Sequence, residues 1–448
     1  MEDKLTIEPV VREKLCTGCG TCAGVCPRSA IRMTVDPGKG CYLPRLDARQ
    51  CTRCGLCHHV CPGHGVDFES LNGRLFGDVP EDVTLGRHLG CYIGHSLDRN
   101  TRYRCSSGGL VSALLVFALE ERLIDGALVT RMRRDNPFRP ESFIARTKEE
   151  ILSAAGSKYC PVAAGTALNE ILQREGRYAV VGLPCHIQGL RKAEHRLPAL
   201  RERIRYRIGI PCSLNYSFFG TERVLHGLGI PPARVDAIQY RGRGRPGSMW
   251  IRLRNGVEQT VPLAAYQRQL APYSLRRCTL CSDMLGELSD LTCGEARIPE
   301  VMRTDTAGSS FVVTRTDGAE ELLEAAASNE AIELSELGVR ELLASQSHAL
   351  FKKRKLAARI EVFKHLGQSV PTYRQKMLTP MQTDYTDALK FYAARYALSG
   401  NRPIVGALVR LARSFRNAGH ADQSETLAQA TGHADSPSQG LAPRGTSE

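Results

Sequence analysis

Residues 16–27 read C-T-G-C-G-T-C-A-G-V-C-P, and residues 51–62 read C-T-R-C-G-L-C-H-H-V-C-P. Both stretches have the spacing C-x2-C-x2-C-x3-C-P, which is typical of chains that hold two [4Fe-4S] clusters through thiolates. In this motif the first three cysteines ligate one cluster, and the fourth, which precedes proline, ligates the other. We therefore predict one cluster on Cys16, Cys19, Cys22 and Cys61, and another on Cys51, Cys54, Cys57 and Cys26.

The residues between these cysteines suit the same chemistry. Gly18, Gly20 and Gly55 are small enough to let backbone N–H groups approach the sulfides of a cluster. A pair of structural zinc sites is the alternative, because zinc also uses C-x2-C pairs, but it does not need this triple-plus-one pattern. Residues 1–72 are thus expected to form a bacterial two-cluster ferredoxin fold, with strand-like segments around the turn at Pro37-Gly38.

Composition indicates a soluble globular protein. Of the 448 residues, 42% are hydrophobic and 24% are charged. We expect no transmembrane segment, since no stretch approaches ~18 consecutive apolar residues. Residues 1–13 are charged and do not resemble a signal peptide. The chain has 17 cysteines, and ligation of eight of them by clusters predicts a reducing, cytoplasmic location.

The formal net charge is +13. The basic runs at 201–207, 241–245 and 352–355 are scattered and carry no interleaved aromatic residues, so we do not expect nucleic-acid binding. A basic surface also suits an acidic partner protein or an anionic cofactor.

From residue 90 onward, helix-like and strand-like patterns alternate, which favours a mixed α/β domain over residues 90–370. Residues 110–119 form an apolar run long enough for a buried helix, and 149–158, 166–174, 186–194 and 319–365 also have helical patterns. Strands are expected within 124–129, 178–185 and 205–211, and at 235–240, 249–254 and 257–262, the last two joined by an Asn255-Gly256 hairpin turn. We expect a linker at 73–89, a helical extension at 371–416 and a disordered tail at 417–448.

Two glycine-containing stretches are candidate anion sites. Ser106-Ser107-Gly108-Gly109 precedes the helix at 110–119, where free N–H groups could cradle a phosphate, or a serine could simply cap the helix. The stretch at 241–247, R-G-R-G-R-P-G, formally matches a dinucleotide fingerprint, but it lies between two strands and contains Pro246. We therefore reject that function for it and expect either a basic loop facing an anion or a solvated turn.

Four further cysteines lie where strands end or loops begin: Cys185, Cys212, Cys278 and Cys281. The ends of strands in α/β sheets are where binding sites assemble, so these thiols could meet at a third cluster. Two alternatives remain from spacing alone. One is a zinc knuckle, and the other is a redox pair at Cys278 and Cys281 beside two buried free thiols.

Several motifs, taken in order, resemble the coenzyme F-420 hydrogenase/dehydrogenase beta-subunit family. They are R-C-S-S-G-G at 104–109, A-G-S-K-Y at 155–159, V-G-L-P-C-H-I-Q-G-L-R at 181–191, G-I-P-C at 209–212, the Arg-Gly hairpin, and C-x2-C-x-D at 278–283. Some members of the family also carry a ferredoxin module in front. The resemblance implies FAD and a [4Fe-4S] cluster in the catalytic domain, giving three clusters in this chain.

The resemblance also implies roles for individual residues. Cys185, Cys212, Cys278 and Cys281 would ligate the third cluster. The flavin would be lined by Ser106, Ser107, Gly108, Gly109, Gly156, Ser157, Lys158 and Tyr159. The chain departs from the family pattern at Leu183, where threonine is frequent, and at Cys293, which is either an alternative ligand or a buried thiol.

These observations predict an iron-sulfur flavoprotein oxidoreductase. Clusters exchange single electrons, whereas a deazaflavin of the coenzyme F-420 type donates a hydride, and a flavin can connect the two. We expect electrons to pass between such a two-electron partner and a ferredoxin-like partner protein, in either direction. The alternatives are a ferredoxin-dependent reductase of a pigment or other organic acceptor, and an electron-relay subunit of a larger redox complex.

Overall fold

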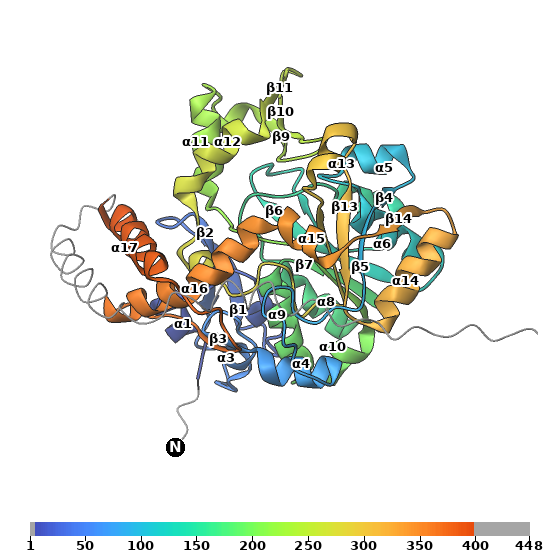
Figure 1. The fold of residues 1–448 in the computed structure, drawn as a ribbon. Coiled ribbons are helices and arrows are strands. Elements are labelled where there is room, and N and C mark those ends of the chain that lie inside the picture. Colours follow the sequence, from blue (N-terminus) through green and yellow to red (C-terminus); the bar gives the residue numbers. More distant parts are fainter. Residues whose placement is uncertain (1–4, 398–448) are drawn as a thin grey trace, which may run out of the picture. The chain divides into compact units, whose positions relative to one another are not determined.

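An eight-stranded mixed sheet forms the centre of the computed structural model, which describes residues 5–397 (Figure 1). The strand order is β14-β4-β13-β12-β8-β7-β5-β6. Strands β12, β8, β7 and β5 are parallel to one another, and antiparallel pairs flank them on both sides. The bounds are β4 (Cys91–Ser96), β5 (Gly126–Met132), β6 (Pro140–Ala145), β7 (Tyr178–Gly182), β8 (Ile204–Gly209), β12 (Leu291–Glu295), β13 (Ser310–Thr314) and β14 (Ile332–Glu336).

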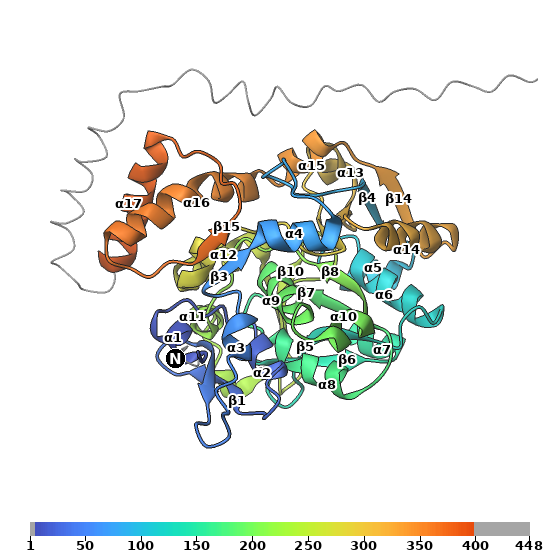
Figure 2. The same cartoon turned by 90° about the horizontal axis from the view of Figure 1, so that it is seen from below.

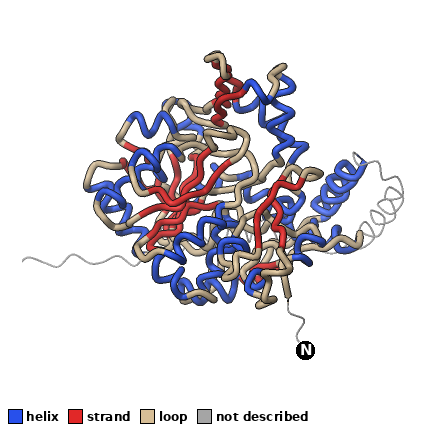
Figure 3. Tube along the Cα trace, turned by 180° about the vertical axis from the view of Figure 1, so that it is seen from behind, coloured by secondary structure: helices blue, strands red, loops and turns tan. Residues whose placement is uncertain are grey.

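Helices cover both faces of this sheet, as Figure 3 shows from behind. One face packs on α6 (Leu110–Glu120) and α14 (Asp317–Ser328), and the other on α8 (Leu168–Gln173), α9 (Pro184–Glu194) and α10 (Pro198–Arg203). The strands alternate accordingly: Ala127 and Val129 belong to the first apolar cluster, and Leu128 belongs to the second. The apolar run predicted to be a buried helix is α6. Shorter helices are α5 (Arg99–Arg104), α7 (Lys148–Ser153), α13 (Pro299–Thr304) and α15 (Val339–Ser345), and α16 (Ser347–His365) is longer.

The N-terminal cysteine-rich part forms the ferredoxin module. Its elements are α1 (Glu8–Arg12), α2 (Thr21–Gly24), β1 (Ile31–Asp36), β2 (Cys41–Leu46), α3 (Leu56–His59), β3 (Gly65–Asp67) and α4 (Phe68–Phe76). Strands β1 and β2 form the expected hairpin, and the Asp36 carboxylate accepts hydrogen bonds from the N–H groups of Gly38 and Lys39 at 3.1 and 3.0 Å. Strand β3 pairs with β15 (Thr372–Arg374), so this module is tied to a distant part of the chain.

The module lies against the sheet domain through backbone contacts (Figure 2). Helix α2 packs on α9 and on the short 3-10 helix Ala164–Ala167, where the Gly165 N–H donates to the Cys19 carbonyl at 2.8 Å. A Cβ atom on Gly24 would clash with the Gly165 carbonyl, and one on Gly189 would lie 2.5 Å from Thr21 Oγ1. The two segments can approach this closely because these positions carry no side chain.

A small antiparallel sheet, β11-β10-β9, packs with α11 (Phe218–Gly227) and α12 (Leu263–Leu270). The strands are β9 (Val235–Gln239), β10 (Ser248–Leu253) and β11 (Glu258–Pro262). The predicted hairpin turn is present, with Gly256 at a φ of 84° and Asn255 Oδ1 accepting from the Val257 N–H at 3.2 Å.

The fold class predicted from sequence is confirmed, and some element predictions are wrong. A continuous helical pattern was expected over 319–365, but Ile332–Glu336 is strand β14, paired antiparallel with β4 at the edge of the sheet. The helix before it stops because Glu330 adopts a φ of 55° in the turn that follows. The helical stretch expected within 149–158 is confirmed as α7, which ends at Ser153.

The Met1–Thr379 unit contains the ferredoxin module and both sheets, and a second unit starts at Pro380. Its described part is helix α17 (Gln382–Ala397), within the predicted extension. Residues 398–448, including the predicted tail, lie outside the described residues. No helix between residues 5 and 397 is long and apolar enough to cross a membrane.

A buried ion network joins α9, β8 and the loop before β12. The Arg191 guanidinium binds Asp290 at 2.6 Å and Glu194 at 3.1 Å, and Arg207 binds Glu194 at 2.8 Å. Opposite charges balance within this group, which lowers the cost of burying them. The network holds together three segments that lead to or from predicted cluster cysteines.

Replacing Arg191 by Ala is expected to lower the free energy of unfolding by about 3–5 kcal/mol, because it leaves two buried carboxylates short of a partner. Arg205→Ala is the matched control. Its exposed side chain approaches Glu321 at 3.9 Å, and its loss should cost less than about 0.5 kcal/mol. Denaturant unfolding of anaerobically purified protein, followed by circular dichroism, measures both. Equal losses in the two variants would contradict a stabilising role for the network.

Candidate functional site

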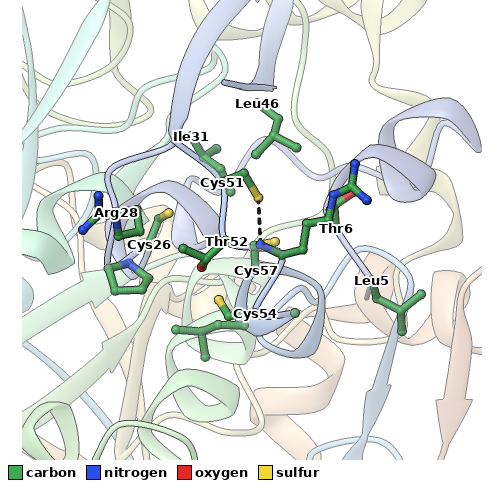
Figure 4. A pocket seen from close by; sticks show the side chains of 14 residues that line it. Leu5, Thr6, Cys26, Arg28, Ile31, Leu46, Cys51, Thr52, Cys54 and Cys57 are labelled. Atoms are coloured by element: carbon green, nitrogen blue, oxygen red, sulfur yellow. Dashed lines mark hydrogen bonds between the residues drawn. The ribbon is translucent and has the colours of Figure 1, made fainter. Parts of the chain in front are cut away.

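Cys26, Cys51, Cys54 and Cys57 line one pocket of the ferredoxin module, which Figure 4 shows. The Arg53 N–H donates to Cys51 Sγ at 3.3 Å, and Gly55, at a φ of 77°, starts helix α3 so that Cys57 turns inward. Burial raises the pKa of Cys57 to about 11, and the neighbouring thiols of Cys54 and Cys26 add to that shift. The structure thus brings together the four thiols that the crossed spacing assigns to one cluster.

The other predicted set also gathers. Burial raises the pKa of Cys16, and the thiols of Cys61 and Cys19 contribute. Burial also raises the pKa of Cys22, and the neighbouring thiols of Cys19, Cys61 and Cys16 add to that shift. The Gly18 N–H donates to Cys16 Sγ at 3.4 Å, which is the kind of backbone contact expected around a cluster. Thiols this close together repel one another once they lose their protons, which raises their pKa. A bound cation or cluster removes that repulsion, so such a group of thiols suits metal ligation.

The described residues contain no group of three or more His, Cys, Asp or Glu close enough to hold a single metal ion. A [4Fe-4S] cube differs from such a site, because its four irons each bind one thiolate and the ligands surround a larger body.

The third cysteine set lies where strands of the central sheet end. Cys185 opens α9 directly after β7, Cys212 follows β8, and Cys278 and Cys281 lie in and after the 3-10 helix Arg276–Leu280. Burial raises the pKa of Cys185, and the next contributions come from Cys19, Cys212, Cys278 and Cys281. These four thiols therefore lie within electrostatic reach of one another.

Asp283 organises the loop that follows. Its Oδ1 accepts hydrogen bonds from the N–H groups of Leu285 and Gly286 at 3.1 and 2.7 Å, and Cys281 Sγ donates to its carbonyl at 3.3 Å. The Cys212 N–H donates to the Met284 carbonyl at 3.0 Å, so this loop also holds the segment of the second thiol. The aspartate of the C-x2-C-x-D motif thus has a visible positioning role.

Two other cysteines have different surroundings. Cys293 is buried in β12 within the apolar core, and burial alone raises its pKa to about 12, with no other cysteine among the causes. Cys41 is half-buried on β2, and burial raises its pKa to about 11, with Cys278 a smaller contributor. Of the two roles left open for Cys293, this packing favours the buried thiol.

Cationic side chains surround the cysteine sets, and of these only Lys352 belongs to a basic run named above. Lys192 Nζ donates to the carbonyls of Cys61 and Gly65 at 2.5 and 2.9 Å, and the buried Arg277 donates to the Gly63 carbonyl at 2.8 Å. Lys352 Nζ donates to the Ser213 carbonyl, next to Cys212. These positive charges would offset the negative charge of thiolate-bound clusters.

The segments predicted to line a flavin meet in part. Ser106 Oγ accepts from the Ser157 N–H at 2.7 Å, which joins the loop before α6 to the loop after α7. Ser107 and Gly108 instead contact Ser310 on β13, and Gly109, rather than a serine, occupies the start of α6. The capping alternative for the two serines is therefore wrong.

A polar cleft of about 950 Å³ lies beside these segments. Ser157 and Lys158 line it, together with Arg104, Arg133, Arg134, Arg243 and Arg252, and Asp236 is its one acidic wall residue. Its volume is near the upper end for small-ligand sites, and its charge suits an anionic ligand. Sequence patterns could not identify it, because its arginines come from separate segments.

Lys158 and the Arg-Gly hairpin supply positive charge at the wall of this cleft. Burial lowers the pKa of Lys158 to about 8, while its ammonium donates to the carbonyls of Ala154 and Gly156. In the Arg-Gly hairpin, Arg241 is buried against Glu295 at 2.5 Å, and Arg243 lies over the Trp250 ring at the cleft. Two alternatives were open for this hairpin, a basic loop facing an anion and a solvated turn. The position of Arg243 at the cleft favours the basic loop.

Tyr159 lies behind the cleft and packs edge-on against Tyr240, with ring centroids 6.3 Å apart. Burial raises the pKa of Tyr216, followed by contributions from Tyr159, Cys212 and Cys278. These three residues, here called the tyrosine layer, therefore extend from the cleft wall at Tyr240 to within electrostatic reach of Cys212 and Cys278.

Comparisons with known proteins identify the family of this chain. Residues 91–169 match the N-terminal model of the coenzyme F420 hydrogenase/dehydrogenase beta subunit, and residues 175–339 match its C-terminal model. The chain belongs to this beta-subunit family. Residues 15–65 match a 4Fe-4S dicluster domain, which confirms the iron-sulfur prediction for the ferredoxin module and, with the family, the oxidoreductase class.

Relatives include the coenzyme F420 hydrogenase subunit beta of Methanothermobacter thermautotrophicus, 28% identical over 302 residues that cover 64% of this chain and 100% of the relative. The coenzyme F420-dependent sulfite reductase of Methanocaldococcus jannaschii is 26% identical over 74% of this chain and 49% of its own length. A chain from the F420-reducing [NiFe] hydrogenase complex of Methanosarcina barkeri has a TM-score of 0.52, with 25% identity over 65% of this chain and 97% of that chain.

Replacing Cys278 and Cys281 together by Ala is expected to lower bound iron from about twelve atoms per chain toward about eight, since one of three cubes loses half of its thiolates. Cys293→Ala is the control and should retain the wild-type iron content. Iron and sulfide determination after anaerobic purification measures both. Unchanged iron in the double variant, or a comparable loss in Cys293→Ala, would contradict the ligand assignment.

Proposed function

We propose that this chain is an iron-sulfur flavoprotein subunit that exchanges electrons between a two-electron organic compound and a one-electron partner protein. The observation that carries the proposal is the packing of α2 on α9, which brings Cys19 of the ferredoxin module toward Cys185 of the third cysteine set at the start of α9. With clusters on both sets, electrons could pass from the sheet domain into the ferredoxin module without crossing a wide gap of protein. The predicted cluster of the sheet domain and the two predicted ferredoxin clusters would then form one continuous path for electrons.

The polar cleft is the proposed site for FAD and the organic compound. Its residues fit such anionic ligands, because the exposed Arg104 and Arg134 offer cationic donors. Lys158 adds positive charge to the wall, although its N–H groups are held by backbone carbonyls. Bound there, a flavin would supply the conversion between hydride transfer and single-electron transfer. Ser106 would act through Ser157 by holding that loop in place.

The tyrosine layer supports a link between the cleft and the third cysteine set. Tyr159 and Tyr216 lie within electrostatic reach of each other, and Tyr216 is within reach of Cys212 and Cys278. A flavin in the cleft would then lie close enough to a cluster on the third cysteine set for electron exchange.

A deazaflavin of the coenzyme F420 type is the proposed organic partner. Relatives named as F420 hydrogenase subunits and as an F420-dependent sulfite reductase support this choice, and so does the basic lining of the cleft. Relatives that are subunits of larger complexes also support a partner protein. A ferredoxin-dependent reductase of another organic acceptor is the second candidate, favoured by the open, largely polar cleft.

Anaerobic mixing of the purified protein with reduced F420 tests the proposal. The expected result is rapid bleaching of flavin and cluster absorbance, with about one FAD and about twelve irons per chain. Reduced nicotinamide is the control and should bleach far more slowly. Absence of bleaching by saturating reduced F420, in protein with full flavin and iron, would contradict the choice of a deazaflavin.

Lys158 makes a pH-dependent prediction. Its ammonium is protonated below pH 8 and loses its proton as pH rises through the pKa of about 8. Affinity for FAD should therefore fall on going from roughly pH 7 to roughly pH 9, by about twofold to fivefold for the loss of one nearby positive charge. Lys158→Gln should bind FAD weakly at both values, without this dependence.

The control for that prediction is Lys148→Gln, since Lys148 is exposed on α7 and pairs with Glu120 outside the cleft. It should keep the wild-type pH profile. Titration calorimetry of FAD into flavin-depleted protein measures all three proteins. A pH dependence that persists in Lys158→Gln would rule out this role for the lysine.

A further inference from the structure

The cysteine set of Cys26, Cys51, Cys54 and Cys57 is the one that reaches the surface. Cys54 is exposed, and Cys26 and Cys51 are half-buried. In the other ferredoxin set, Cys16 is half-buried, and Cys19, Cys22 and Cys61 are each 6% exposed, so that this set has no exposed member like Cys54. The buried set is also the one whose Cys19 lies near Cys185 of the sheet domain. A three-cluster path would thus run from the sheet domain through the buried set to the set beside Cys54.

The surface around Cys54 is basic. Arg28 and Arg53 line the same pocket as Cys54, and Arg49 lies two residues before Cys51. All three arginines are exposed. Within the described range 5–397, none of their guanidinium groups has a hydrogen-bonded or ion-paired acidic partner. We refer to these residues with Cys54 as the Cys54 face.

Two carboxylates lie near this face, and neither is hydrogen-bonded to one of its guanidinium groups. The Glu8 carboxylate accepts a hydrogen bond at 3.2 Å from the hydroxyl of Thr6, which lines the same pocket. The Asp47 carboxylate accepts hydrogen bonds from the Arg49 backbone N–H at 2.9 Å and from Gln50 Nε2 at 2.8 Å, rather than from a guanidinium. Leu5 lines the same pocket and is 41% exposed. An apolar residue beside exposed charged residues is a common composition for protein interfaces.

We propose that the Cys54 face is the docking site for an acidic one-electron carrier protein. The proposal rests on the proposed function for the route by which electrons reach this face. Charge complementarity determines the kind of partner, since exposed cations attract a carrier whose redox centre is ringed by carboxylates. A cluster held by Cys26, Cys51, Cys54 and Cys57 would supply the carrier with one electron, and this face would hold the carrier beside Cys54 while no bond is formed and no proton is transferred.

The test uses the complete protein, reduced with dithionite and freed of excess reductant, so that it does not require the organic substrate. Stopped-flow absorbance then follows electron transfer to two probes, an acidic [2Fe-2S] ferredoxin and the basic protein cytochrome c. The variants are Arg28→Glu/Arg53→Glu and Arg49→Glu. The control is Arg122→Glu, an exposed arginine in the turn after α6, which lies apart from the ferredoxin module in Figures 1 and 2.

The double variant should lower the second-order rate constant for the acidic ferredoxin by about tenfold or more at low salt, and raise that for cytochrome c. Arg49→Glu should act in the same direction, and Arg122→Glu should change neither rate by more than about twofold. Iron content and the reduced-cluster EPR spectrum establish that each variant retains its clusters.

Equal responses of both carriers, or responses no larger than those of Arg122→Glu, would overturn the proposal. A wild-type rate to acidic ferredoxin that does not fall with added salt would also overturn it. Failure of reduced F420 to bleach the protein would instead count against the proposed function, while a charge-dependent rate from dithionite-reduced protein would still support the docking site.

Discussion

The close backbone approach of the ferredoxin module to the sheet domain is the constraint on which the rest of this molecule depends. Helix α2 lies directly on the turn Ala164–Ala167 and on α9, where Gly24, Gly165 and Gly189 leave no room for a side chain. The hydrogen bond from Gly165 to the Cys19 carbonyl fixes the register of this contact. Cys19 is thereby held near Cys185, which sits one turn or less from the start of α9.

The central sheet supplies the other half of the arrangement. Strands β7 and β8 end beside each other, so Cys185 and Cys212 emerge at one edge, and the loop held by Asp283 brings in Cys281. The buried network of Arg191, Glu194 and Asp290 keeps these strand ends in place. Its charges balance, whereas the lysines and arginines around the thiols leave excess positive charge where anionic clusters would sit.

Features that depend on residues close together in the sequence could be predicted from it. The ferredoxin spacing, the buried helix at 110–119 and the Asn255-Gly256 turn each depend on neighbouring residues, and each is present in the structure. The gathering of Cys185, Cys212, Cys278 and Cys281 could be anticipated from strand ends and from the family resemblance. Their role as ligands remains a prediction, as do the domain boundaries.

What the sequence could not predict depends on distant contacts. Residues 332–336 read I-E-L-S-E, which fits a helix as well as a strand, and pairing with β4 decides the outcome. The cleft could not be foreseen because Arg104, Arg133, Arg243 and Arg252 come together only on folding. The approach of Cys19 to Cys185 has no sequence signal beyond glycines whose packing partners lie more than a hundred residues away.

Electron paramagnetic resonance of the fully reduced protein tests the central claim most directly. If the clusters on the Cys19 and Cys185 sets are neighbours, the spectrum should integrate to about three spins and show line splitting and fast relaxation from magnetic coupling between the two domains. Coupling confined to the two ferredoxin clusters, with the third cluster giving the spectrum of an isolated centre, would contradict the account.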